Sequence, residues 1–81
     1  MKRDTKVLKA LGVYVRQRRE ALGMSQEDLA GLAELHRNYI GGIERGDRDP
    51  GLTALIELAR GLGLSASALI GAVQSAADNE A

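Results

Sequence analysis

The segment between residues 25 and 45 constrains the fold of this chain most strongly. Ser25, followed three residues later by Asp28, resembles a capping box with a short acid, and it predicts that a helix begins at Gln26. A tight turn and a second short amphipathic helix, from Arg37 to about Arg45, are expected to follow. Two such helices joined by a turn form a helix-turn-helix. We therefore expect this arrangement to be the centre of the fold.

Apolar residues at three- and four-residue intervals predict three further helices. These helices cover Lys6–Leu22, Leu52–Leu62 and Ala66 to about Ala72, and the apolar stripes of the first two include Leu22 and Leu52. Helix ends and a loop are marked by Gly23, Gly46, Gly63 and Pro50. No strand pattern is visible. We therefore expect one all-α domain of five helices over residues 1–74, followed by a small, polar and flexible tail at 75–81.

The composition argues against several classes of protein. With 81 residues the chain can form one small domain. It has no cysteine, which removes disulfides and thiolate zinc sites and makes a reducing cytosol the simplest location. No apolar stretch approaches the roughly 20 residues needed to cross a bilayer, so no membrane span is expected. His36 is the only histidine, and no nucleophile lies in a pattern with a base, so we expect no metal, no cofactor and no enzyme activity.

The distribution of charge is more informative than the total. The formal net charge is zero, although most nucleic-acid-binding domains carry a basic excess. Residues 1–19, however, hold seven basic side chains and one acid, while the remainder is acidic. Such an asymmetry can orient a domain on phosphate while keeping non-specific affinity low. The alternative is a basic face that is merely solvated.

The second helix of a helix-turn-helix can place its first residues in the DNA major groove, while the first helix braces it across the backbone. Double-stranded DNA is therefore the leading candidate partner.

Several short motifs together carry a family resemblance. They are Leu35–Ile40, Ile43–Gly46, the pair Asp49–Pro50, and Leu52. Over roughly residues 11–70 the chain resembles the xenobiotic-response-element and phage-repressor helix-turn-helix family. Within that family, the sequence of residues 36–40 is most similar to that of restriction-modification controller proteins. The resemblance implies a five-helix, lambda-repressor-like domain that forms a homodimer, binds a palindromic operator and regulates transcription, with RNA polymerase as a further candidate partner.

The chain also departs from the family pattern. Glu34 replaces the usual glycine of the inter-helix turn, and in left-handed geometry a non-glycine residue costs on the order of 1 kcal/mol. Gly42 stands where family members often carry a polar base-reading side chain, so readout is expected to depend on the start of the helix. The phage-repressor pattern further implies that Arg19 and Glu44 form a structural ion pair between the first and third helices.

The first residues of the second helix of the unit are the predicted base contacts. Arginine can bind guanine O6 and N7 bidentately, and asparagine can pair with adenine N6 and N7. Arg37 and Asn38 are therefore expected to determine specificity. The alternative is that Arg37 meets only phosphate and that Asn38 points to water.

A second group of residues is expected to contact the DNA backbone, or the backbone and bases together. Gln26 begins a helix whose positive end favours phosphate. For the others, simple solvation, packing or helix capping is the alternative. The group comprises Gln26, His36, Tyr39, Arg45, Arg48 and Arg16, with Lys9 in a position similar to that of Arg16.

The last two helices contain three apolar residues in addition to those expected to face the core. Ile56, Ile70 and Val73 would suit a homodimer interface, or would complete the core. A different class of function remains open on the same fold, namely a protein-interaction module such as an antitoxin or a co-regulator. The short polar tail offers little apolar area for such a partner.

Overall fold

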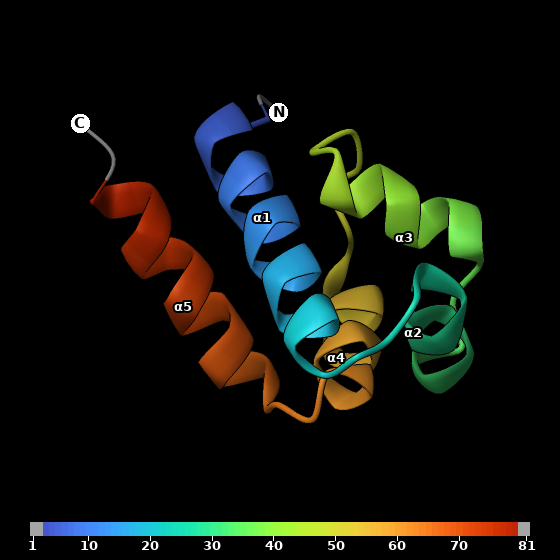
Figure 1. The fold of residues 1–81 in the computed structure, drawn as a ribbon. Coiled ribbons are helices and arrows are strands. Elements are labelled where there is room, and N and C mark those ends of the chain that lie inside the picture. Colours follow the sequence, from blue (N-terminus) through green and yellow to red (C-terminus); the bar gives the residue numbers. More distant parts are fainter. Residues whose placement is uncertain (1–2, 80–81) are drawn as a thin grey trace.

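The computed structural model describes residues 3–79, which form five α-helices and no strand (Figure 1). The expected all-α, five-helix class is confirmed. The helices are α1 (Thr5–Ala21), α2 (Gln26–Ala33), α3 (Arg37–Glu44), α4 (Leu52–Gly61) and α5 (Ala66–Asp78).

The helices pack around one apolar core. Figure 1 shows α1 and α5 side by side, α2 and α3 on the other side of the molecule, and α4 low in the view between α1 and α2. α1 packs against α5 and α3, and α2 packs against α3 and α4. The largest fully buried side chains are Leu29, Ile40, Ile43, Leu58, Leu62, Leu69 and Val15. Because α3 contributes two of them, one face of this short helix is held against the core and the opposite face is turned outward.

Local side-chain caps explain where the helices of the central unit begin. The Ser25 hydroxyl accepts a hydrogen bond from the Asp28 backbone N–H, and the Asp28 carboxylate accepts one from the Ser25 N–H, so the predicted capping box is confirmed. His36 Nδ1 accepts a hydrogen bond from the Asn38 backbone N–H at 3.0 Å. These bonds satisfy amide groups that lack a partner within their own helices.

Two expectations about helix ends and faces are wrong. α5 continues to Asp78 rather than ending near Ala72, because Ala77 is buried and helix-forming residues lead up to it. Residues 75–78 of the expected tail are therefore helical, while residues 80 and 81 lie outside the described part. Leu22 and Leu52 do not face inward; they are 48% and 70% exposed, because each lies at a helix end rather than on the buried stripe.

Glu34 ends α2 with φ 54° and ψ 40°, in the left-handed region, as the turn requires. Replacing it with glycine removes the steric cost of that geometry but adds freedom to the unfolded chain. We therefore expect Glu34→Gly to raise the free energy of unfolding by up to about 1 kcal/mol, measured by urea denaturation. Glu34→Ala is the control, because it removes the same charge and keeps the strain. Equal stabilisation by both variants would contradict this explanation.

Candidate DNA-binding surface

The predicted base-contacting residues lie at the exposed start of α3. The side chains of Arg37 and Asn38 are both exposed, while Ile40, which faces away from Asn38, is fully buried. Arg37 forms one ion pair, with Glu27 of α2, at 3.6 Å, and both side chains are largely exposed. Such a pair contributes little to stability and can open when a stronger partner arrives.

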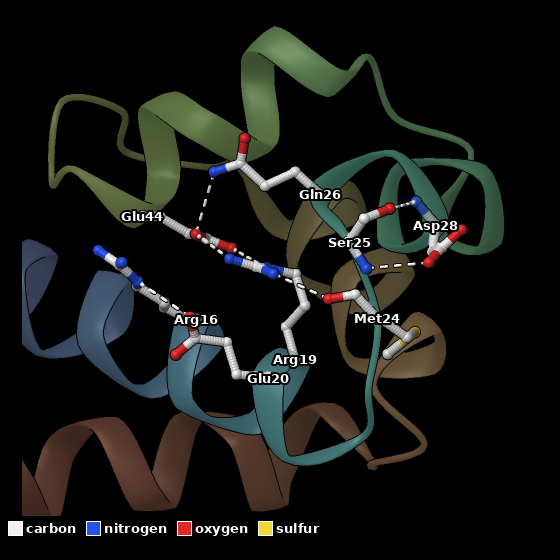
Figure 2. Close-up of polar contacts among 8 residues, drawn as sticks. All are labelled: Arg16, Arg19, Glu20, Met24, Ser25, Gln26, Asp28 and Glu44. Carbon is white, nitrogen blue, oxygen red and sulfur yellow. Dashed lines mark hydrogen bonds and ion pairs between the residues drawn. The ribbon is translucent and has the colours of Figure 1, made fainter.

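A buried ion pair fixes the other end of α3. Arg19 Nε donates to Glu44 Oε2 at 2.7 Å and Arg19 Nη2 donates to Glu44 Oε1 at 2.9 Å, so the pair is bidentate (Figure 2). The two side chains are only 10% and 5% exposed. Their contact was expected from the family pattern, and the structure places them together. It joins α1 to the last residue of α3.

Two further groups complete this cluster, and sequence reasoning missed both roles. Arg19 Nη1 donates to the Met24 carbonyl at 2.8 Å, and Gln26 Nε2 donates to Glu44 Oε1 at 3.1 Å. Figure 2 shows the Glu44 carboxylate between Arg19 and Gln26. The start of α2 is therefore tied to the end of α3 through one carboxylate. The predicted contact of Gln26 with phosphate remains a prediction.

The cluster determines how Glu44 titrates. Burial disfavours its charged form, but hydrogen bonds from Arg19 and Gln26 and the positive charges of Arg19 and Arg16 outweigh burial. The pKa of Glu44 is therefore lower than its ordinary value. A carboxyl group with a lowered pKa stabilises the fold above its ordinary pKa, and this contribution is lost as the pH falls through the lowered pKa.

Stability should therefore decrease on acidification. We expect the free energy of unfolding to change little between about pH 5 and 7 and to fall below about pH 4. Urea denaturation at several pH values measures this change. Asp28 also has a lowered pKa, because the Ser25 backbone and hydroxyl donate hydrogen bonds to it, so Asp28→Asn is the control. If Asp28→Asn showed no decrease in the free energy of unfolding at low pH, the decrease in the native chain would be due to the capping box and not to Glu44.

The remaining predicted contact residues have different surroundings. Arg16 forms an exposed pair with Glu20 at 3.6 Å, and Arg45 forms one with Asp47 at 3.0 Å. The guanidinium carbon of Arg48 lies 5.9 Å from the centre of the Tyr39 ring. Lys9 is exposed on α1. Arg16, Arg45 and Arg48 are surface cations, so their contacts with DNA remain predictions.

The predicted dimer residues do not share one environment. Val73 is 6% exposed and belongs to the core of the single chain, which is the alternative considered for it. Ile70 is 43% exposed, and Ile56 is partly exposed. Only these two therefore present appreciable surface to another subunit.

Other kinds of site are not supported within residues 3–79. No group of three or more histidine or acidic side chains there is arranged to hold a metal ion. No single described helix is long and apolar enough to cross a membrane; α4 and α5 reach that length and hydropathy only as a pair, and the two helices meet at 99°.

Comparisons with known proteins agree with this geometry. The profile of the family described as Helix-turn-helix matches residues 15–69. Control protein C.SmaI of Serratia marcescens is 43% identical over 60 residues, which cover 74% of this chain and 71% of that protein.

Two solved structures are similar as well. The restriction-modification controller protein C.AhdI from Aeromonas hydrophila is 42% identical, with a TM-score of 0.73 over 76% of this chain and 94% of that one. The controller protein C.Esp1396I, solved as a tetramer with its natural 35 base-pair operator, is 30% identical, with a TM-score of 0.79 over 90% of this chain and 96% of that one.

Proposed function

The chain belongs to the helix-turn-helix family and, within it, to the restriction-modification controller proteins, and on this basis we propose that it is a sequence-specific DNA-binding regulator of transcription. It binds an inverted-repeat operator as a homodimer. The observation that carries the proposal is that α3 has an exposed start and a firmly held end. Arg37 and Asn38 are exposed at its start, while Glu44 at its end is held by Arg19.

The geometry supports different roles for α3 and α2 in DNA binding. α3 enters the major groove, where Arg37 binds a guanine edge and Asn38 an adenine edge. α2 lies across the backbone, with the amide groups and side chain of Gln26 near a phosphate. A two-fold dimer places its two copies of α3 in successive major grooves, roughly 34–36 Å apart. The assembly of C.Esp1396I with its operator supports this arrangement.

The exposed Glu27–Arg37 pair bears on specificity. In the absence of DNA, the guanidinium of Arg37 lies near the Glu27 carboxylate at 3.6 Å. A guanine edge can replace the carboxylate, because it accepts two hydrogen bonds from the same planar group. Where no guanine is within reach, Arg37 can bind only Glu27 or a phosphate, and neither contact depends on the base sequence.

Selection of the purified protein against a random duplex library, at near-physiological salt, tests the proposal. We expect an inverted repeat to be enriched. Arg37→Ala and Asn38→Ala should each cost roughly 1–3 kcal/mol of discrimination and relax the base preference at their own positions. Arg60→Ala is the matched control, because Arg60 is an exposed arginine on α4, paired with Glu57, and it should leave the selected sequence unchanged.

Failure of folded protein to enrich any sequence would overturn the proposal. The fold would then serve as a protein-interaction module, and recovery of a stoichiometric protein complex would identify that role. Retention of the full base preference in both the Arg37 and Asn38 variants would preserve DNA binding but remove these two residues as its readers.

A further inference from the structure

Part of the outward face of α3 is covered by another segment of the chain. Asn38 and Gly42 are four residues apart and share the face opposite the buried Ile40 and Ile43. A glycine on an outward face would normally be exposed, yet Gly42 is buried. Some other part of the chain therefore occupies the space beside it.

The side chain of Arg48, from the loop between α3 and α4, occupies that space. A Cβ atom placed on Gly42 would lie 2.7 Å from Cγ, 3.3 Å from Nε and 3.6 Å from Cδ of Arg48. Farther along the same side chain, the guanidinium carbon lies 5.9 Å from the Tyr39 ring centre. The stem of Arg48 therefore crosses α3 where a side chain at position 42 would begin.

Arg48 also differs from the other arginines of this surface in its charge partners. Arg37 is paired with Glu27, and Arg45 is paired with Asp47. Among residues 3–79, no carboxylate forms an ion pair with Arg48. Its guanidinium rests beside an aromatic ring, which holds a cation without using its hydrogen-bond donors.

We propose that Gly42 is a positioning residue whose missing side chain allows Arg48 to lie along the outward face of α3 and to read a guanine edge there. The loop thus supplies the base contact that the helix itself lacks at position 42. Arginine suits this role, since its planar group binds guanine O6 and N7 together. The inference rests on the proposed function, because it concerns how the same surface selects its DNA.

Gly41 does not have the same role. A Cβ atom on Gly41 would lie 3.1 Å from Nη1 of Arg45, which is the far end of a flexible side chain already paired with Asp47. That end can move by a few tenths of an ångström without displacing the stem. At Gly42 the contact is with the stem, so an added methyl group must move the whole Arg48 side chain.

A double-mutant cycle tests this coupling. Affinity for the selected operator is measured for the native chain, Gly42→Ala, Arg48→Ala and the double variant. We expect each single variant to bind roughly tenfold more weakly and the double variant to bind no more weakly than Arg48→Ala alone. Both single variants should lose base preference at the same operator positions. A purely structural effect of Gly42→Ala would weaken binding at all positions alike.

Two controls make the result interpretable. Gly31→Ala makes the same change within α2, where an added Cβ meets nothing within 4 Å, and it should leave affinity and base preference unchanged. Urea denaturation shows that each variant is folded. Gly42→Ala is expected to fold, because alanine favours a helix and the displaced Arg48 side chain is exposed.

Additive losses in the cycle would overturn the inference, as would unchanged or tighter binding by Gly42→Ala. Either result would show that Gly42 does not act through Arg48, while leaving the proposed function standing. Absence of any selected operator for the native chain would instead refute the proposed function and this inference with it.

Discussion

Arg19→Ala is expected to lower the free energy of unfolding by about 3–5 kcal/mol, because it leaves the Glu44 carboxylate buried without its cation. Glu44 would keep only the hydrogen bond from Gln26, and the Met24 carbonyl would lose its donor. A core of this size rarely supplies more than about 3–5 kcal/mol of stability, so most of the variant should be unfolded at 25 °C. Urea denaturation followed by circular dichroism measures the loss.

Arg16→Ala is the matched control for this prediction. Arg16 lies on the same helix and pairs with Glu20 at 3.6 Å, but both side chains are more than half exposed. Its replacement should change stability by less than about 1 kcal/mol. A similarly small loss for Arg19→Ala would show that the buried pair does not hold α3 in place. Replacing both partners, as in Arg19→Met with Glu44→Leu, should recover much of the loss, since no buried charge then remains unpaired.

This expectation affects how DNA-binding variants are interpreted. Arg19 lies in the basic segment at the start of the chain, and its replacement would abolish DNA binding by unfolding the domain. Arg37 differs, because its ion pair with Glu27 is exposed and contributes little to stability. Loss of binding by Arg37→Ala, with unchanged stability, therefore reports on the DNA contact itself.

The features that the sequence predicts well depend on neighbours within one turn of chain. Ser25 and Asp28 are three residues apart, so their reciprocal caps can be recognised without any tertiary information. Gly23 and Gly46 end their helices with positive φ for the same local reason. Glu34 adopts the left-handed geometry that the turn demands, although its side chain disfavours it. The Arg19–Glu44 pair was predicted from family resemblance, not from spacing alone.

The features that the sequence did not predict arise where distant segments meet. The length of α5 depends on burial of Ala77. This residue continues the four-residue spacing of Leu69 and Val73, but alanine is too small and too common on exposed helix faces to indicate burial from the sequence. The covering of Gly42 depends on the path of the loop that carries Arg48. From helix propensity alone, a glycine within a helix is expected only to weaken that helix. Propensity does not distinguish a glycine in open space from one that accommodates another segment.

Gly12 is the clearest case of a glycine that accommodates another segment of the chain. Gly12→Ala is expected to lower the free energy of unfolding by about 3 kcal/mol. A Cβ atom at Gly12 would lie 2.5 Å from the Glu44 carbonyl oxygen and 2.7 Å from that of Ile43. Both neighbours are backbone atoms, which cannot turn aside as the end of a side chain can. α1 and the end of α3 would have to separate, and the Arg19–Glu44 pair between the same two helices would be strained.

The sign of this effect separates packing from propensity. Alanine is favoured over glycine in a helix by about 1 kcal/mol, so propensity alone predicts that Gly12→Ala is stabilising. Gly31→Ala, where an added Cβ meets nothing within 4 Å, should show that stabilisation, up to about 1 kcal/mol. Urea denaturation of the two variants should therefore give changes of opposite sign. If both were stabilising, α1 and α3 would not be held in the close approach seen at Gly12. In that case the ion pair and the buried Ile40 and Ile43 would anchor α3 without that close approach.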